Sequence, residues 1–173
     1  MSVQPIIVVG FMGSGKTTVA EQLAHHLRRG WTDLDELIAQ HEQRKPGEII
    51  RQDGEDTFRE LETRMLQKAL EQDSRTIIAA GGGAWTIPRN RELIAKHRAV
   101  AIWLDAPFEL CWKRIESTDQ ARPMAPTRLT ARDLFEERRP VYELADFRIA
   151  VDETQTAEEI AQKIVSALSR ENS

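Results

Sequence analysis

The chain has 173 residues, enough for one domain with a proper hydrophobic core. Its 24 Lys and Arg residues against 28 Asp and Glu residues give a formal net charge of −4. This charge argues against nucleic acid as the main partner, because nucleic-acid binders usually carry a basic excess.

No apolar stretch approaches the length of a membrane span, and the N-terminus lacks the basic-then-apolar pattern of a signal peptide. We therefore expect a cytoplasmic protein with neither a membrane nor a nucleic-acid partner. The single cysteine, Cys111, can form no internal disulfide. It stands between Leu110 and Trp112 in a helical pattern, so we interpret it as a small buried hydrophobe.

Strand-like apolar runs alternate with helical patterns along the chain, which is typical of a parallel sheet covered by helices. The continuous apolar character of the runs fits strands that are buried on both faces. Strands are expected at residues 6–9, at a short run ending near Asp33, and at 76–80, 99–104 and 147–151. Helices are expected at residues 16–29, 35–41, 55–72, 89–97, 108–116, 130–144 and 156–169.

Two of the expected helices begin with capping-box patterns, Thr130-x-x-Asp133 and Thr156-x-x-Glu159. Residues 118–129 differ from their surroundings because they are polar, contain two prolines and show no periodicity. We interpret them as a mobile surface loop of the kind that often forms a lid in enzymes. There is no internal repeat and no low-complexity linker.

A complete G-x-x-x-x-G-K-[ST] phosphate-binding loop follows the first apolar run, as Gly10-Phe11-Met12-Gly13-Ser14-Gly15-Lys16-Thr17, and a helical pattern comes next. Glycines allow backbone N–H groups to curl around a polyphosphate, and the positive end of the helix points at the same anion. Lys16 adds a cation for the β- and γ-phosphates, and the Thr17 hydroxyl can bind Mg²⁺. The alternative is a glycine-rich turn with an accidental Lys-Thr pair. The combination of strand, loop and helix favours a nucleoside triphosphate site.

Two acidic residues, Asp33 and Asp35, stand at the end of the expected second strand. Residues two apart on a strand share a face, so both carboxylates would point to one side while Leu34 packs on the other. The C-terminal ends of parallel strands line the ligand crevice of an open sheet. One carboxylate could position Mg²⁺ through water, and the other could accept a proton from a substrate hydroxyl. An acidic turn that caps the next helix explains the pattern equally well.

A glycine triplet, Gly81-Gly82-Gly83, follows the expected third strand. Three glycines permit close approach of the backbone to a ligand, although a structural turn would explain one or two of them. Trp85, just after the triplet, is the one tryptophan that could touch a ligand. The other tryptophans are interpreted as packing residues.

Three arginines stand where an anionic substrate could be held: Arg59, Arg122 and Arg138. Guanidinium groups suit carboxylate and phosphate, and they can neutralise charge on a transferring phosphoryl group. A solvated surface position is the alternative for each of them. The four histidines lie in helical stretches without metal-ligand spacing, so no role is assigned to them.

Taken together, these segments resemble shikimate kinases, and the resemblance runs over nearly the whole chain in the same order. The shared motifs are the phosphate loop G-x-M-G-x-G-K-[ST] at residues 10–17, Asp-x-Asp at 33–35, G-E-x-x-F-R-x-x-E at 54–62, the glycine triplet, Arg-Pro at 122–123 and R-x-P-x-Y at 138–142. The phosphate loop alone is common to a very large class. The G-E-x-x-F-R segment, the triplet and R-x-P-x-Y together are much more specific.

The resemblance implies an α/β fold, a P-loop kinase-like three-layer sandwich with a central five-stranded parallel sheet, helices on both faces and a mobile lid. Residues 1–173 would form a single domain, with the substrate-binding region at about 33–62 and the lid at about 117–129. The implied reaction is transfer of the γ-phosphate of ATP to the 3-hydroxyl of shikimate, which gives shikimate 3-phosphate and ADP in aromatic amino acid biosynthesis. ATP and Mg²⁺ are the implied cofactors.

The resemblance also implies a role for individual residues. The implied catalytic residues are Lys16, Asp35 and Arg122, with Asp35 as base or orienter of the accepting hydroxyl. ATP would be bound by Gly13, Ser14, Gly15, Lys16, Thr17, Thr18, Arg114 and Arg122, with Arg114 stacked on adenine. Mg²⁺ would be held by Thr17 and Asp33. Shikimate would be bound by Asp35, Arg59, Gly81, Gly82, Gly83 and Arg138, with the two arginines clamping its carboxylate.

Three segments depart from the family pattern. Gln43-Arg44-Lys45-Pro46 replaces a stretch that usually contains glycine, Ile50 stands where a phenylalanine commonly walls the shikimate ring, and Met124-Ala125 replaces leucines. None of these changes removes a residue with a charge role.

Two alternatives stay open. One is a sibling small-molecule kinase, such as one acting on gluconate, which has no evident need for the triplet together with Arg59 and Arg138. The other is a nucleotide-binding module that has lost phosphoryl transfer. No long heptad or obvious interface stripe is present, so we expect a monomer.

Overall fold

The computed structural model describes residues 4–118 and 123–171. Within these residues, five parallel strands form one sheet in the order β2-β3-β1-β4-β5. The strands are β1 (Ile6–Val9), β2 (Trp31–Asp33), β3 (Ile77–Ala79), β4 (Val100–Asp105) and β5 (Phe147–Ala150). Because β1 is central, the loop that follows it emerges between the ends of β3 and β4.

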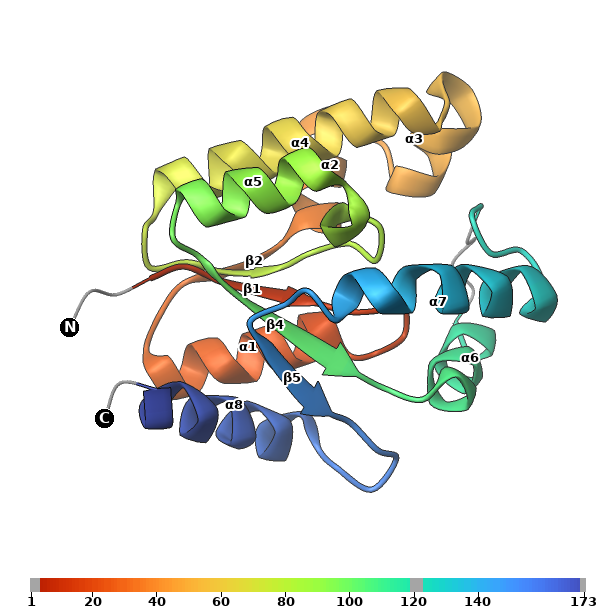
Figure 1. The fold of residues 1–173 in the computed structure, drawn as a ribbon. Helices are drawn as coiled ribbons and strands as arrows, with labels where there is room; N and C mark the ends of the chain where they lie inside the picture. Colours follow the sequence, from red (N-terminus) through yellow and green to blue (C-terminus); the bar gives the residue numbers. More distant parts are fainter. Residues whose placement is uncertain (1–3, 119–122, 172–173) are drawn as a thin grey trace.

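Helices cover both faces of the sheet (Figure 1). They are α1 (Lys16–Leu27), α2 (Leu34–Glu42), α3 (Pro46–Asp53), α4 (Glu55–Gln72), α5 (Pro88–Lys96), α6 (Phe108–Glu116), α7 (Arg128–Tyr142) and α8 (Ala157–Glu171), with a short 3₁₀ helix, η1 (Ala84–Thr86). In Figure 1, α1 and α8 lie together below the sheet, while α2, α4 and α5 lie above it. The predicted three-layer α/β sandwich is therefore confirmed.

The strands form the centre of the hydrophobic core. Ile7, Val8 and Val9 of β1 and Ile77 and Ile78 of β3 are fully or almost fully buried. This burial on both faces explains why the strands read as continuous apolar runs and not as alternating ones. The strand arrowheads in Figure 1 point to the side where α6 and the start of α7 lie, and this is the carboxyl edge of the sheet.

Helix α3 is absent from the helices expected from the sequence pattern. It is short, and its start depends on Pro46 at the first position and on Glu48, whose carboxylate accepts from the Lys45 backbone N–H at 2.8 Å. Only Ile49 of this helix is buried, so its apolar periodicity is too weak to stand out in the sequence.

The second helix begins one residue before its predicted start, at Leu34, because Asp33 is its N-cap. The expectation that Asp33 and Asp35 share one face of a strand is therefore wrong, since the chain has already turned into a helix at Leu34. Leu34 is fully buried, as expected.

One of the two predicted capping boxes is confirmed. The Thr156 backbone N–H donates to Glu159 Oε2 at 2.8 Å, and the Glu159 N–H donates to Thr156 Oγ1 at 3.2 Å. The other is wrong, because α7 begins at Arg128 and Thr127 is its N-cap, with Thr127 Oγ1 accepting from the Thr130 N–H at 3.2 Å. The first two residues of α7 therefore lie within residues 118–129, which were predicted as a loop.

Cys111 is fully buried, as predicted, and burial raises the pKa of its thiol to about 11. Its position in α6 places its backbone carbonyl against the phosphate loop. None of the helices in the described residues is both long and apolar enough to cross a membrane.

Candidate active site

The phosphate loop joins β1 to α1 at the centre of the carboxyl edge. Gly13 has φ 78°, in the left-handed region, and a Cβ at this residue would lie 2.6 Å from the carbonyl oxygen of Cys111. Both the backbone conformation and the contact with α6 therefore require glycine here. Lys16 Nζ donates to the carbonyl oxygens of Gly10 and Phe11, each at 2.9 Å, so the lysine lies across the loop that precedes it.

Helix α6 contacts the same loop through Arg114. Its Nη1 donates to the carbonyl oxygen of Gly13 at 3.0 Å. The residue assigned to adenine by resemblance is thus next to the phosphate loop, although the two are 101 positions apart in sequence.

The Thr17 hydroxyl donates to Asp33 Oδ2. The other carboxylate oxygen of Asp33 accepts from the backbone N–H of Asp35 at 2.9 Å and of Glu36 at 3.3 Å. The helix-capping alternative is therefore correct for Asp33, and its carboxylate also faces the phosphate loop. The residues fit Mg²⁺, because a hydroxyl and a carboxylate are hard oxygen ligands of the kind that the ion takes beside phosphates and water. In the described part of the chain no cluster of three acidic, His or Cys side chains could hold a metal by itself.

A cavity of about 670 Å³ opens beside the phosphate loop. Met12 of the loop forms part of its wall. Polar lining comes from Asp35 of α2, Arg59 and Glu62 of α4, the glycine triplet after β3, and Arg138 of α7, and the start and body of α3 add Lys45, Glu48 and Arg51. Residues that were predicted to bind the substrate and that are far apart in sequence therefore line one cavity, together with Glu62.

The two arginines of this cavity lie directly against the glycine triplet. A Cβ on Gly82 would lie 3.2 Å from Arg138 Nη1, and a Cβ on Gly83 would overlap the guanidinium of Arg59. Arg138 is buried, with 6 % of its surface exposed. The alternative that these arginines are ordinary solvated surface residues does not hold for either of them.

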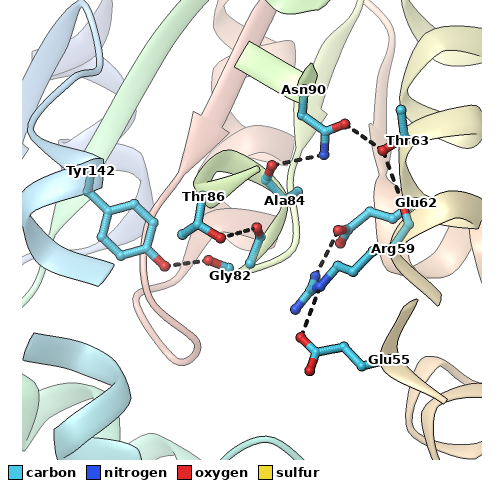
Figure 2. Close-up of polar contacts among 10 residues, drawn as sticks. Glu55, Arg59, Glu62, Thr63, Gly82, Ala84, Thr86, Asn90 and Tyr142 are labelled. Atoms are coloured by element: carbon cyan, nitrogen blue, oxygen red, sulfur yellow. Dashed lines mark hydrogen bonds and ion pairs between the residues drawn. The ribbon is translucent and has the colours of Figure 1, made fainter. Parts of the chain in front are cut away.

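Arg59 is held by two carboxylates of its own helix, as Figure 2 shows. Its Nη1 lies 2.8 Å from Glu62 Oε1, and its Nε lies 3.4 Å from Glu55 Oε1. Burial of the guanidinium works against its charge, but the two carboxylates outweigh this effect and the pKa of Arg59 is raised. Arg59 therefore stays a cation inside the cavity wall.

Sequence reasoning missed two residues of this region, Glu62 and Tyr142. Both belong to the family motifs quoted above, as the last residue of G-E-x-x-F-R-x-x-E and of R-x-P-x-Y, and this was the available signal. The Tyr142 hydroxyl donates to the Gly82 carbonyl oxygen at 2.5 Å (Figure 2). Burial raises the pKa of Tyr142 to about 12, so its phenol stays a neutral donor.

Trp85 has a different role from the one considered. It is buried, it donates through Nε1 to the Val141 carbonyl oxygen at 2.9 Å, and it is absent from the lining of the cavity. It supports the contact between η1 and α7.

Of the departures from the family pattern, four residues line the cavity: Lys45, Pro46, Ile50 and Met124. Pro123 of the Arg-Pro motif lines it too. Arg122 lies outside the described residues.

Comparison with known proteins agrees with this geometry. A family model described as shikimate kinase matches residues 12–169. A shikimate kinase of Microcystis aeruginosa is 39% identical over 166 residues, which cover 94% of this chain and 85% of the relative. One from a Sulfurihydrogenibium species is 37% identical over 166 residues, covering 95% and 98%.

The solved structure of shikimate kinase from Acinetobacter baumannii in complex with shikimate has a TM-score of 0.88 to this chain. It is 33% identical, and the match covers 98% of this chain and 95% of that one. Since the family model and these relatives span almost the full length, the chain belongs to the shikimate kinase family.

Proposed function

We propose that the chain is an ATP-dependent kinase that phosphorylates the 3-hydroxyl of shikimate, with shikimate bound in the cavity and ATP bound at the phosphate loop. The observation that carries this proposal is the contact between the cavity and the phosphate loop at Gly82. A Cβ on this residue would lie 3.4 Å from the Met12 backbone nitrogen and 3.2 Å from Arg138 Nη1. A substrate held by the arginines would therefore lie beside the loop that binds the phosphates of ATP.

Arg59 and Arg138 would clamp the shikimate carboxylate. Guanidinium groups form strong charge-assisted hydrogen bonds with carboxylates, and both arginines come from helices, which hold them in place. The Gly82 backbone amide would help to seat the ring, while Gly81 leaves room for the Asp35 and Glu62 carboxylates and Gly83 for the Arg59 guanidinium.

Asp35 would hydrogen-bond the accepting hydroxyl and either take its proton or orient it. Its carboxylate lies at the cavity, beside Gly81, where a Cβ would lie 3.1 Å from Asp35 Oδ1. A loose phosphoryl-transfer transition state needs this kind of positioning more than covalent chemistry.

The phosphate loop would bind ATP through the backbone of Gly13, Ser14 and Gly15 and through Thr18, while Arg114 would stack on adenine. Lys16 would exchange its loop carbonyl partners for the phosphates and stabilise charge during transfer. Thr17 and Asp33 would hold Mg²⁺, which supplies positive charge to the phosphate oxygens when it is bound.

Residues 117–129, with Arg122, are proposed as the lid that excludes competing water, and residues 33–62 as the substrate-binding region of one domain. We further propose that the chain acts as a monomer in the cytoplasm, where ATP is supplied.

The test is MgATP turnover, measured as ADP release, with shikimate and gluconate offered separately. Release with shikimate alone would support the proposal. Turnover with gluconate would favour the sibling kinase. ATP binding without turnover on either compound would favour the module that has lost phosphoryl transfer. The Lys16→Ala variant is the control for contaminating kinases.

A further inference from the structure

Glu62 is a buried carboxylate in the wall of the substrate cavity. Its side chain is 1 % exposed, and its two oxygens have different surroundings. Oε1 pairs with Arg59 Nη1 at 2.8 Å, whereas Oε2 has no hydrogen-bond partner among the described residues. A buried carboxylate oxygen without a partner is costly while the group is charged.

The charged groups that face Glu62 come from three helices. Arg59 of its own helix α4 and Arg138 of α7 favour its anionic form, and Asp35 of α2 opposes it. A Cβ on Gly81 would lie 3.1 Å from both Glu62 Oε2 and Asp35 Oδ1, so the two carboxylates flank the same point of the cavity. Glu55 also pairs with Arg59, but its side chain is half exposed and water screens its charge.

Around Glu62, two arginines balance two carboxylates, and the other charged residues of the cavity lining, Glu36, Lys45, Glu48 and Arg51, balance one another as well. Burial raises the pKa of the Glu62 carboxyl above its ordinary value even so, and Asp35 adds to the shift while the arginines oppose it. A substrate carboxylate on Arg59 and Arg138 would be a third negative charge, leaving the cavity with one negative charge in excess. Proton uptake removes this excess charge at the lowest cost in free energy when the proton binds to the most buried carboxylate, the one that has an oxygen without a partner. Asp35 is partly exposed, so this group is Glu62.

We propose that Glu62 is a positioning residue whose carboxylate is an anion in the free enzyme and holds Arg59 in place. When a ligand carboxylate binds to Arg59 and Arg138, Glu62 takes up one proton on Oε2. The proton comes from solvent or buffer through the cavity, and no other bond is made or broken. This inference rests on the proposed function, because it takes an acidic substrate at this clamp.

The sign of the pH dependence follows from linkage. The pKa of Glu62 is higher in the complex than in the free enzyme, so the affinity for shikimate is greatest below the free-enzyme pKa and falls as the pH rises between the two pKa values. Within that window the dissociation constant rises by up to about tenfold per pH unit for one proton. A residue that only supports the fold would weaken binding at every pH alike.

The experiment is calorimetric titration of the full chain with shikimate in two buffers of different ionisation enthalpy, repeated across the pH range. At pH values between the two pKa values of Glu62, the wild-type protein is expected to take up close to one proton per bound shikimate. Glu62→Gln keeps an acceptor for Arg59 and mimics the protonated acid, so its uptake should fall to near zero and its affinity should be independent of pH. The control Glu60→Gln removes a charge from an exposed position of the same helix and should leave the uptake unchanged.

Binding of shikimate by the wild type without proton uptake would overturn the inference while leaving the proposed function intact. The same uptake in Glu62→Gln would overturn it too. Absence of any shikimate binding would instead refute the proposed function and the inference with it. If Glu62→Gln does not fold, the ¹³C NMR signal of the Glu62 carboxyl carbon in glutamate-labelled wild-type protein decides: a shift to the position of a protonated carboxyl when shikimate binds supports the inference, and an unchanged signal overturns it.

Discussion

A methyl group added at Gly83 tests whether the placement of Arg59 determines shikimate binding. A Cβ here would lie 2.6 Å from both Cζ and Nη1 of Arg59, too close for the guanidinium to keep its place. The backbone of Gly83, at φ −95° and ψ −14°, accepts alanine without strain. Because the obstructed atoms are the end of a flexible side chain, we expect Arg59 to move and the backbone to stay.

The size of the effect follows from what Arg59 would lose. Hydrogen bonds to charged groups contribute about 1.5–3 kcal/mol, so displacing Arg59 from the shikimate carboxylate should raise the KM for shikimate roughly 10- to 100-fold. The KM for ATP should change by less than about twofold, because Arg59 is proposed to bind shikimate and not ATP. The same movement weakens the pair with Glu62, so the melting temperature should fall by about 2–4 °C for each kcal/mol lost.

The assay is steady-state ADP release with each substrate varied in turn. Gly30→Ala is the matched control, because its Cβ would make only an ordinary contact, 3.7 Å from Asp73 Oδ2. In an Arg59→Ala background, Gly83→Ala should have almost no further effect on the KM for shikimate. A full additive effect in that background, or an equal rise in the KM for ATP, would refute the reasoning.

The remaining predictions concern four other residues. Lys16→Ala should lower kcat by about 10³-fold or more, because charge stabilisation in phosphoryl transfer is lost, and substantial turnover would remove this lysine from the reaction. Asp35→Asn should lower kcat by about 10²–10⁴-fold with ATP affinity kept, which separates a base or orienter from an ATP ligand. Tyr142→Phe should cost about 0.5–1.5 kcal/mol of unfolding free energy, measured by urea titration, through the bond to Gly82. Cys111, with a thiol pKa of about 11, should resist alkylation at about pH 8 until the protein unfolds.

The parts of the fold that could be predicted are those encoded locally. Strand β1 and helix α4 begin and end where their apolar runs and helical periodicity do, because burial of a continuous segment leaves its pattern in the sequence. The phosphate loop is equally local, since its glycines and Lys16 all lie within residues 10–16. Helix α3 could not be predicted in this way, because with a single buried residue it leaves almost no pattern.

Several residues predicted for the site line one cavity, but their contacts could not be predicted. Sequence reasoning identified Asp33 as an acidic residue at a strand end, but the split of its two oxygens between the α2 backbone and Thr17 depends on where the helix begins. Glu62 was missed because its position in α4 looks like that of any solvated helix carboxylate. Only the packing of α4 against the triplet shows that it is buried.

In the proposed function, the glycine triplet joins substrate recognition to phosphate binding. On one side, Gly82 accepts a hydrogen bond from Tyr142 and lies against Arg138; on the other, it lies beside the backbone of Met12 in the phosphate loop. A side chain at this position would separate the two, because a Cβ would meet Arg138 Nη1 at 3.2 Å and the Met12 nitrogen at 3.4 Å. The distance between the proposed carboxylate clamp and the phosphate loop therefore depends on the backbone contact of Gly82 with Met12 and on the fit of the Arg138 guanidinium against Gly82. Phosphoryl transfer depends on such alignment, so substitutions at Gly82 should reduce kcat as well as shikimate binding, unlike those at Gly83, which act through Arg59 alone.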